Sequence, residues 1–410
     1  MKIYLVGGAV RDQLINYPVK EKDWVVVGAT VDEMLELGYQ QVGKDFPVFL
    51  HPETKDEHAL ARTERNTAPG YRGFEVHASP DVTLEEDLIR RDLTINAMAE
   101  DEDGNIVDPY NGQSDLKLKL LRHVSPAFGE DPVRILRVAR FAARYAHLGF
   151  TVASETLQLM QQMVQNGEAD ALVAERVWQE FNKALSERNP EVFIQVLRDC
   201  HALKIILPEI DALFGVPQAI EHHPEIDTGI HTLLVLQQAS LLTNEPATRF
   251  AALCHDLGKA LTPEENWPSH YGHEALGVKP IIELCNRLRI PTNFKDVACI
   301  TAKFHLHVHR AFEIKKSTLL KTIERVDGMR KPERYEQFLI ACTADIRGRP
   351  GYEDHPYPQA DYYREALKII KSVDIRALKE AGLQGNEMAN AIHAARLSAL
   401  NKLLKTPENI

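Results

Sequence analysis

The sequence predicts an α+β protein in which a small mixed sheet comes first and helical domains follow. Up to about residue 120, short apolar runs alternate with turns, which is the pattern of a small sheet with few helices. Beyond residue 126, apolar residues recur at helical spacing. A chain of 410 residues also exceeds what one hydrophobic core usually holds. We therefore expect four segments: a sheet-containing head at 1–125, a helical neck and body at 126–225, an all-α domain at 226–346 and a helical tail at 347–410.

The first expected element is a strand followed by a glycine turn and a short helix. Ile3–Val6 is apolar, Gly7-Gly8 follows, and the helix begins near Ala9. Because glycine lacks a Cβ atom, the backbone of this turn can approach a ligand closely. A helix start presents unpaired N–H groups to an anion, and Arg11 lies one turn in. The stretch therefore predicts a phosphate-binding turn, although most glycine pairs of this kind form only a turn.

A second strand, Trp24–Val27, follows an acidic pair. Glu21 and Asp23 are two residues apart, so their side chains share one face if the segment is extended. Two carboxylates beside a phosphate-binding turn suit Mg²⁺ bridged to a nucleoside triphosphate, which indicates nucleotidyl transfer. The alternative is a solvated hairpin edge. Glu57 could supply a third carboxylate, but a surface glutamate on a strand is an equally good interpretation.

The remaining elements of the head are short. We expect a helix at Val31–Gly38 and another capped by Asp81 or Thr83, whose acidic first turn suits the helix dipole. Arg91 follows in a polar cluster beside an apolar segment, which favours a phosphate clamp, although an arginine pair can also be merely solvated. The other expected strands are Val48–His51, Ala59–Ala61 and Glu75–Ala78.

An arginine-rich helix begins near Pro132. Its arginines recur at spacings of three, three and four, so they share one face, and apolar residues take the other. Four arginines on one face of an acidic protein favour a polyanion. Asp131 and Arg134 are three residues apart, so they can form an internal salt bridge or read a base edge as acceptor and donor. The four arginines are Arg134, Arg137, Arg140 and Arg144.

Further helices are expected in the neck and body, where apolar residues most simply serve packing. Pro208, Gly215 and Pro217 form a cluster that indicates a boundary before the next domain. The expected helices include Leu157–Val164, Val177–Leu185 and Val192–Leu203.

The third segment is rich in histidine. His231 opens an apolar helix, and the adjacent His255 and Asp256 end another. Histidine and aspartate on neighbouring helices provide the mixed nitrogen and oxygen ligands that a divalent cation accepts. A single buried histidine is usually only a hydrogen-bonded core residue, so the prediction depends on the grouping. Further candidates are His270, His273, His305, His307, His309 and Asp345. The three histidines from 305 to 309 alternate, so a surface strand or loop is an alternative there.

Composition narrows the class of protein. The five cysteines are scattered without a C-x-x-C pair, which indicates reduced thiols and neither a disulfide framework nor a zinc ribbon. Met1 leads directly into a strand, and no apolar run approaches the roughly 18 residues of a membrane helix. The net charge of −11 argues against a generally basic nucleic-acid binder but permits a local basic stripe. We expect a cytoplasmic protein with no membrane partner, either a monomer or a weak homodimer.

Several motifs occur together in the order found in one enzyme family. GGAVRD, the E-x-D pair, RRDLTINAMA, DPYNG and EDPVRILRVARFAAR resemble the motifs of class II CCA-adding tRNA nucleotidyltransferases, over roughly residues 1–150. The resemblance implies a polymerase-β-like palm that adds CCA to tRNA, with CTP and ATP as substrates. It implies that Glu21 and Asp23 hold Mg²⁺ and that Asp131 and Arg134 select the base. Aspartate is commoner than glutamate at the first metal position, so we expect altered geometry there and a retained metal. The implied nucleotide contacts are Gly8, Arg11, Arg91, Arg137 and Arg140.

The histidine pattern, with HDLGK at its centre, resembles the HD phosphohydrolase superfamily. The resemblance implies a divalent metal, Mg²⁺, Ni²⁺ or similar, that activates water for attack on a phosphoester. Its ligands would be His231, His255, Asp256 and Asp345, and His273 and His305 would contact substrate or a second metal.

CCA-adding enzymes that carry a C-terminal HD domain match essentially the whole chain. The resemblance implies phosphatase, 2′-nucleotidase and 2′,3′-cyclic phosphodiesterase activities of the HD domain, with His255 and Asp256 as its catalytic residues. Two rival readings are open. One is a poly(A) polymerase, and the other is an RNA-binding HD hydrolase whose transferase head is inactive.

Overall fold

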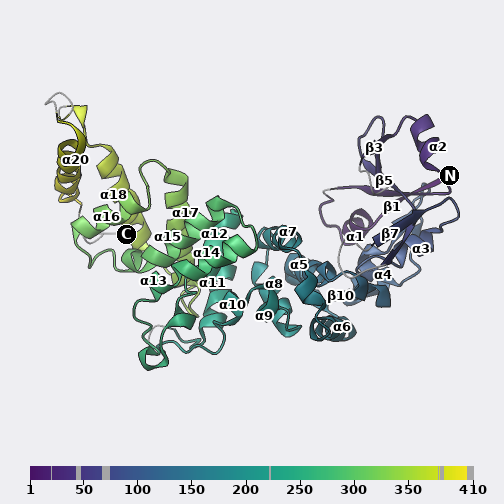
Figure 1. Cartoon of the computed structure of the whole chain (residues 1–410), viewed down its shortest axis with the longest axis horizontal. Helices are drawn as coiled ribbons and strands as arrows, with labels where there is room; N and C mark the ends of the chain where they lie inside the picture. The colour runs from purple at the N-terminus through teal and green to yellow at the C-terminus, as the bar shows by residue number, and fades with distance from the viewer. Residues whose placement is uncertain are drawn as a thin grey trace. The chain divides into compact units, whose positions relative to one another are not determined.

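The computed structural model describes residues 1–19, 21–42, 48–66, 74–220, 223–376, 378 and 383–403. The chain divides into two compact units. The first unit contains Met1–Ala184 and Val192–Ile206, and the second contains Leu185–Glu191 and Leu207–Ile410. Figure 1 colours the chain from purple at the start of the first unit to yellow at the end of the second. The finer division into four segments remains a prediction.

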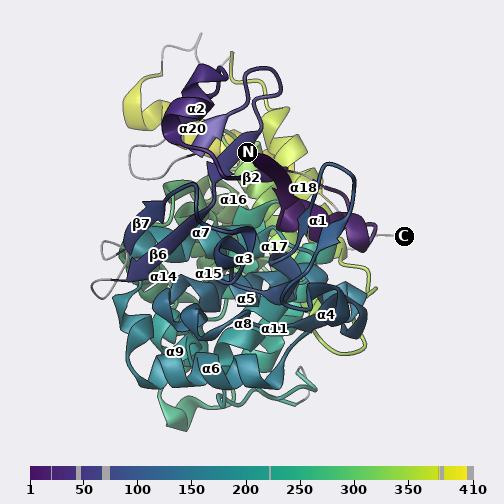
Figure 2. The same ribbon diagram turned by 90° about the vertical axis from the view of Figure 1, so that its right-hand side faces the viewer.

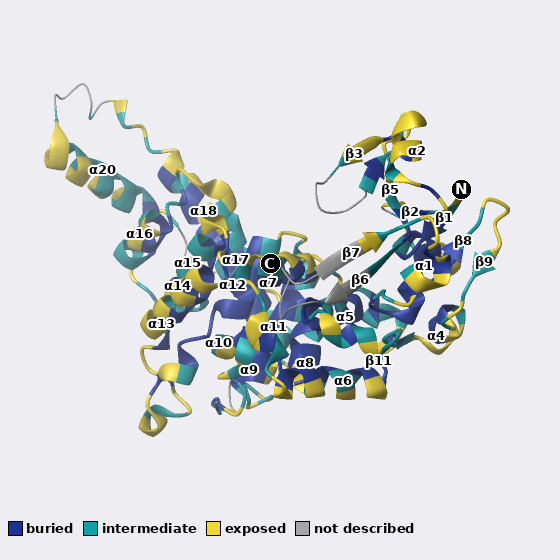
Figure 3. Cartoon of the chain, turned by 45° about the vertical axis from the view of Figure 1, so that its right-hand side comes forward, coloured by how far each residue is buried: buried dark blue, intermediate teal, exposed yellow. Residues whose placement is uncertain are grey.

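β1 and β2 form the centre of the sheet in the first unit. They pair antiparallel, which places Asp23 opposite Val6, and β5 pairs with β2 in parallel. Neighbouring residues of a strand point to opposite faces, and Val25 and Val26 accordingly belong to two different buried apolar clusters. Apolar side chains therefore pack on both faces of the sheet, and Figure 3 colours each described residue by how far it is buried. Among the described residues the sheet order is β3 (Gln40–Val42), β4 (Val48–Leu50), β5 (Glu57–Leu60), β2 (Asp23–Val27), β1 (Lys2–Val6), β8 (Ala99–Glu100) and β9 (Ile106–Val107).

Two further strands form a separate ribbon. β6 (Arg62–Asn66) and β7 (Phe74–Ala78) pair antiparallel, and β6 packs against α3 (Figure 2). Thr83 caps α3 through a capping box with Glu86, so Thr83 and not Asp81 is the cap residue of the two that the sequence offered. The expected strands of the head are all present, with ends shifted by one or two residues.

The helices of the first unit follow the predicted apolar spacing with one exception. The expected helix Val192–Leu203 is interrupted, because α8 ends at Asp199 and a turn follows in which His201 has a φ of 64°. The helices are α1 (Gly8–Leu14), α2 (Val31–Glu36), α3 (Leu84–Leu88), α4 (Gly112–Leu118), α5 (Val133–Tyr145), α6 (Ser154–Gln165), α7 (Ala174–Leu185), α8 (Pro190–Asp199) and α9 (Leu203–Ile206), with a 3₁₀ turn at Thr94–Asn96.

Helices are the main elements in the described residues of the second unit. α11, α12, α15 and α17 pack against one another, and a buried apolar cluster joins α15 to the helices that follow. The helices are α10 (Pro208–Asp211), α11 (Thr228–Leu242), α12 (Pro246–Cys254), α13 (His273–Leu276), α14 (Val278–Arg287), α15 (Thr292–His309), α16 (Lys316–Arg325), α17 (Pro332–Arg347), α18 (Pro358–Lys371) and α20 (Gly385–Leu400).

The architecture confirms the predicted class: a small mixed sheet in an N-terminal head, then helices. None of the described helices combines the length and the apolar character that a membrane crossing requires.

Two candidate active sites

The glycine turn of the first unit receives an arginine side chain. Gly7 has a φ of 69°, and a Cβ atom there would lie 2.7 Å from Nη1 of Arg91. Arg91 therefore packs directly on the backbone of the turn. α1 begins at Gly8, and Arg11 on it is buried. The Arg11 guanidinium donates from Nε to Oδ1 of Asp12 at 2.8 Å and from Nη1 to Oδ1 of Asn96. The turn, Arg11 and Arg91 thus come together as predicted.

The candidate carboxylates lie at the end of β2. Asp23 is the first residue of the strand and is in register with Glu57 on the parallel strand β5, so their side chains leave the same face. Glu21 lies just before the strand, and all three carboxylates are exposed. Partial desolvation and the charge of Glu21 raise the pKa of Asp23, while Arg91 and Arg137 act in the opposite direction.

This set of oxygen donors fits a hard divalent cation. Carboxylates are the protein ligands that Mg²⁺ prefers, and it usually retains waters and phosphate oxygens in its remaining positions. The electrostatic influence of Arg91 and Arg137 on Asp23 shows that cationic side chains lie within range of the same point. A metal-bound triphosphate would therefore meet both the ligands and the counter-charges that it needs.

The arginines of α5 do not form the open basic stripe that the sequence predicted. Arg140 is buried, and its Nε donates to Oε2 of Glu180 at 2.6 Å. Arg144 donates to Oδ2 of Asp12 at 3.1 Å, and Arg134 donates to backbone carbonyls. A sequence shows cations in a row but not the anions that other segments bring to them, so the charge of this face was overestimated.

Arg137 is the member of the row whose charge acts on the candidate metal ligand Asp23. Its Nε donates to Oδ2 of Asp92 at 2.7 Å, and 38% of its side chain remains exposed. Burial alone would raise the pKa of Asp92, but Arg137 and the amide of Asn96 hold it well below its usual range. Asp92 is therefore ionised and holds the guanidinium of Arg137, whose charge acts on Asp23.

Asp131 has a partner that the sequence did not indicate. Its two carboxylate oxygens accept from Nη1 and Nη2 of Arg176, on α7, at 3.1 and 2.8 Å. Arg134, its expected neighbour, donates to the carbonyl oxygens of Ala127 at 2.8 Å and Arg90 at 2.6 Å. Arg176 lies 45 residues further along the chain, so no local spacing could have identified it.

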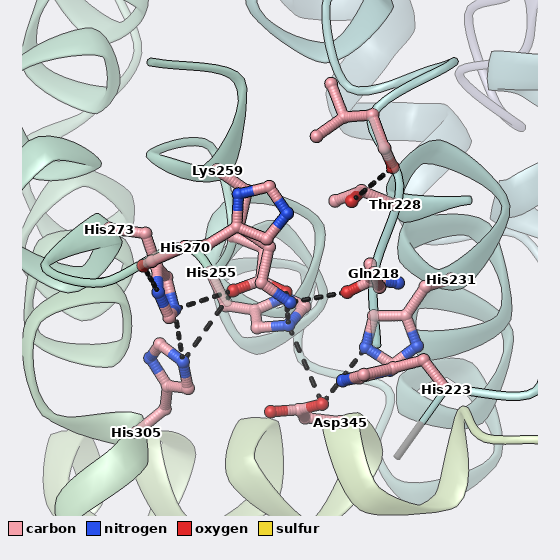
Figure 4. Close-up of polar contacts among 12 residues, drawn as sticks. Gln218, His223, Thr228, His231, His255, Lys259, His270, His273, His305 and Asp345 are labelled. Carbon is pink, nitrogen blue, oxygen red and sulfur yellow. Dashed lines mark hydrogen bonds and ion pairs between the residues drawn. The ribbon is translucent and has the colours of Figure 1, made fainter. Parts of the chain in front are cut away.

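The second site lies among the helices α11, α12, α15 and α17 of the second unit, and Figure 4 shows its side chains. His231 comes from the first turn of α11, His255 and Asp256 follow the end of α12, and Asp345 lies on α17. All of them are buried. Nε2 of His231 lies 3.1 Å from Oδ1 of Asp345, and Nε2 of His255 lies 3.7 Å from the same oxygen. The four predicted ligands therefore converge.

Asp256 also faces a second pair of histidines. Its Oδ1 lies 3.2 Å from Nε2 of His273 and 3.7 Å from Nε2 of His305, and these two nitrogens are 3.3 Å apart. Two groups of three potential ligands result, one of His231, His255 and Asp345 and the other of Asp256, His273 and His305. A third group among the described residues, His223, Glu225 and His231, shares His231 with the first of these.

The alternative of a strand or loop for residues 305–309 is wrong, because they end α15. Residues four apart share a helix face, so His305 and His309 both reach the site. His307 lies on another face and pairs with the hydroxyl of Thr322 at 2.8 Å.

The protonation of the site suits a cation. Burial lowers the pKa of His305 to about 3, which leaves its imidazole neutral and able to ligate. Burial alone would raise the pKa of Asp256 and Asp345, but the neighbouring His255 keeps both carboxyls ionised. Nε2 of His255 lies 3.1 Å from Oδ2 of Asp256 and 3.7 Å from Oδ1 of Asp345, and these two carboxylates raise the pKa of His255 despite its burial. A divalent ion bound between the same three side chains would replace the proton of that imidazole.

Four polar residues of this site were not predicted, and one of them is His223, whose Nδ1 lies 3.0 Å from Oε1 of Glu225. Nζ of Lys259 lies 2.6 Å from Oδ2 of Asp256 and donates to Oε1 of Gln218. Oε1 of Glu225 lies 2.8 Å from Nδ1 of His231. Lys259 stands in the HDLGK motif, which was a usable signal, whereas Gln218 and Glu225 lie in a loop without a recognisable pattern.

Comparison with known proteins identifies the family. Residues 3–122 match the family "Poly A polymerase head domain", residues 149–214 match "Probable RNA and SrmB- binding site of polymerase A", and residues 228–341 match "HD domain". The chain is 62% identical over 403 residues to the multifunctional CCA protein of Thioalkalivibrio sulfidiphilus, covering 98% of both chains. It is 59% identical over 408 residues to that of Teredinibacter turnerae, covering 100% of this chain and 99% of the relative.

Solved structures support the same fold. A CCA-adding enzyme in complex with ATP is 20% identical, with a TM-score of 0.67 over 98% of this chain and 88% of the other. The Thermotoga maritima CCA-adding enzyme in complex with tRNA is also 20% identical, with a TM-score of 0.64 over 100% of this chain and 88% of the other. Since full-length relatives share more than half of its residues, the chain belongs to the family of multifunctional CCA proteins.

Proposed function

We propose that the first unit adds CCA to the 3′ end of tRNA, with CTP and ATP as substrates and without a nucleic-acid template. The names of the relatives and the solved complexes with ATP, CTP and tRNA support this activity. The observation that carries it is the placement of Asp23 at the end of β2, with Glu21 beside it and Arg91 and Arg137 within electrostatic range. Such an arrangement serves transfer of a nucleotide from a metal-bound triphosphate.

The carboxylates are the proposed metal site of this unit. Glu21 and Asp23 would hold Mg²⁺, and Glu57 is a proposed third ligand because it is in register with Asp23. When bound, Mg²⁺ polarises the α-phosphate and activates the 3′-hydroxyl of the tRNA. The extra methylene of Glu21 gives its carboxylate a longer reach from a position outside the strand.

The proposed triphosphate contacts are the turn and the nearby cations. Gly8 offers its backbone, while Arg91 and Arg137 offset the phosphate charge as the leaving pyrophosphate develops. Arg11 would orient the same groups through its fixed position between Asp12 and Asn96. Arg140 would first have to exchange its contact with Glu180, so its role as a direct nucleotide ligand requires a change of partner.

Asp131 and Arg134 are proposed to choose the base. A carboxylate acceptor and a guanidinium donor can distinguish C and A from other bases by hydrogen bonding to the base edge. Arg176 holds the Asp131 carboxylate through two parallel hydrogen bonds, which would make the template side chain rigid before the nucleotide binds.

The second unit is proposed to be a metal-dependent phosphohydrolase with phosphatase, 2′-nucleotidase and 2′,3′-cyclic phosphodiesterase activities. His231, His255, Asp256 and Asp345 would ligate a divalent ion such as Mg²⁺ or Ni²⁺. His273 and His305 would ligate a second ion or contact the phosphate. The convergence of buried imidazoles and carboxylates in this site supports the metal assignment. When bound, the ion supplies an activated water for attack on the phosphoester.

Nucleotide incorporation tests the transferase proposal. Purified protein receives Mg²⁺, CTP, ATP and a tRNA that lacks its last three nucleotides, and Asp23→Ala and Asp256→Ala are measured beside the wild type. We expect addition to stop after CCA, to be lost in Asp23→Ala and to persist in Asp256→Ala. Open-ended addition of A would instead support a poly(A) polymerase, and no addition by the wild type would leave only an HD hydrolase.

The hydrolase proposal needs a separate substrate. An oligonucleotide ending in a 2′,3′-cyclic phosphate is incubated with each protein and with Mg²⁺ or Ni²⁺. We expect ring opening by the wild type and by Asp23→Ala, and none by Asp256→Ala. Equal hydrolysis by Asp256→Ala would contradict the assignment of this site. A cytoplasmic location and a monomeric or weakly dimeric state remain predictions.

A further inference from the structure

His309 contacts the second site but belongs to none of the groups of potential metal ligands in the described part of the chain. Its Nε2 lies 2.7 Å from Oδ2 of Asp345, and its Nδ1 lies 2.6 Å from Oη of Tyr357. The ring is mostly buried, so both nitrogens face protein groups.

Chemistry fixes the direction of these two hydrogen bonds. An ionised carboxylate only accepts, so Nε2 of His309 must carry the proton that is donated to Asp345. Nδ1 is then the unprotonated nitrogen and accepts from the hydroxyl of Tyr357. Burial raises the pKa of Tyr357 well above its usual value, which keeps that hydroxyl protonated. The chain of donors therefore runs from Tyr357 through His309 to Asp345.

The two oxygens of Asp345 consequently have different partners. Oδ2 is held by His309, whereas Oδ1 faces His231 at 3.1 Å and His255 at 3.7 Å. A carboxylate held through one oxygen cannot rotate freely, so the other oxygen keeps its direction toward the site. Arg349, at 4.0 Å from Oδ1, adds only a distant charge.

We infer that Tyr357 and His309 are positioning residues that hold Asp345 so that Oδ1 points at a divalent cation. The inference rests on the proposed metal site of the second unit. Tyr357 directly precedes α18 and lies outside the all-α domain predicted at 226–346. The predicted tail at 347–410 therefore contributes to this site, which the sequence did not indicate. Removing either partner should weaken metal binding even though neither side chain touches the ion.

Binding of Ni²⁺ alone to the full chain tests this inference. Ni²⁺ binds imidazole ligands more tightly than oxygen ligands alone, so it should bind the histidine-containing site of the second unit in preference to the carboxylates of the head. Isothermal titration with Ni²⁺ therefore reports on the second unit. The variants are His309→Leu, His309→Gln and Tyr357→Phe, with Asp256→Asn as the reference for a lost ligand. Circular dichroism of each metal-free variant checks that it is folded.

The chain provides matched controls. His307→Gln changes a histidine on the same helix that pairs with Thr322 and not with Asp345. Tyr362→Phe changes a tyrosine of α18 that is as buried as Tyr357 and bonds to Lys316. Both controls should bind Ni²⁺ as the wild type does.

We expect His309→Leu to lose about tenfold or more in Ni²⁺ affinity, the usual range for removing a partner of a ligand. His309→Gln, whose amide can still donate to Asp345, should lose less, and Tyr357→Phe should also fall between the wild type and His309→Leu. Wild-type Ni²⁺ affinity in both His309→Leu and Tyr357→Phe would overturn the inference. Tighter Ni²⁺ binding by His309→Leu than by His309→Gln would also overturn it, because the apolar variant would then show that only packing matters at this position. No Ni²⁺ binding by the wild type, or equal binding by Asp256→Asn, would instead overturn the proposed metal site, and the inference with it.

Discussion

Gly258 lies where the segment that carries His255 and Asp256 contacts the segment that carries His273. It follows His255 and Asp256 by three and two residues, and α13 with His273 packs directly on it. A Cβ atom at Gly258 would lie 1.9 Å from the backbone oxygen of His273 and 2.6 Å from the backbone nitrogen of Gly277. Both contacts are with backbone, so no side-chain rotation can relieve them.

The size of the required movement can be worked out from these contacts. Since real Cβ contacts are essentially never below 3.0 Å, Gly258→Ala must separate the two segments by about 1 Å at the 1.9 Å contact. Metal ligands tolerate only about 0.2 Å of error in their distances. The 3.2 Å approach of Asp256 and His273 would open well beyond that tolerance. We expect Ni²⁺ affinity to fall by about tenfold or more and overpacking to cost about 1–3 kcal/mol of unfolding free energy.

Isothermal titration with Ni²⁺ and urea denaturation of the metal-free protein measure the two effects. Gly277→Ala is the matched control, because its Cβ would lie 3.1 Å from the nitrogen of Gly258 and needs a shift of only a few tenths of an ångström. Gly129→Ala, where a Cβ meets nothing within 4 Å, controls for the substitution itself. Wild-type Ni²⁺ affinity together with an unchanged urea midpoint in Gly258→Ala would refute this reasoning.

Four other outcomes follow from the contacts. Asp12→Asn should cost about 3–5 kcal/mol in urea denaturation and weaken CTP binding, because buried Asp12 accepts from Arg11, Arg144 and Tyr145; a loss below 1 kcal/mol would argue against it. Arg249→Ala should cost at least about 2–3 kcal/mol, since its guanidinium donates to the backbone carbonyls of residues 185, 187, 240 and 243, and an unchanged urea midpoint would disprove this. Thr83→Ala should cost about 1 kcal/mol by thermal denaturation, as the capping hydroxyl is lost, and no change would show that Glu86 alone suffices. Burial holds the pKa of His305 at about 3, so the unfolded state takes up more protons and the metal-free protein should lose stability as pH falls from about 6.5 toward 3; His305→Gln should flatten that slope in urea titrations.

Much of the fold was predictable because apolar spacing and turn residues are local signals. The strand, glycine turn and second strand of the head lie within one or two residues of their expected bounds. The alternation of His305, His307 and His309 left a strand or loop open as an alternative, because polar side chains there replace the apolar face that usually marks a buried helix. Phe304 and Val308, four residues apart and both buried, carried the helical period there.

The candidate sites were predictable only in part for a different reason. Glu21, Asp23 and the HD ligands stand in recognisable motifs, and the structure brings each group together. The hydrogen-bond partners of the site residues do not stand in recognisable motifs. Arg176 reaches Asp131 across 45 residues, and Tyr357 reaches His309 across 48. Such pairs are set by packing of distant helices, which spacing along the chain does not encode.

The division of the chain has a practical consequence for separating the two activities. Residues 185–191 belong to the second unit although residues 192–206 return to the first, so the polypeptide passes between the units three times. Arg249 binds the carbonyl oxygens of Leu185 and Glu187 within that short excursion. A protein that ends at Ile206 would therefore contain residues 185–191 without Arg249, which binds two carbonyl oxygens of that segment. A protein that starts at Leu207 would contain Arg249 without these two acceptors. No single cut yields two intact halves, so the activities are better dissected by point substitution than by truncation.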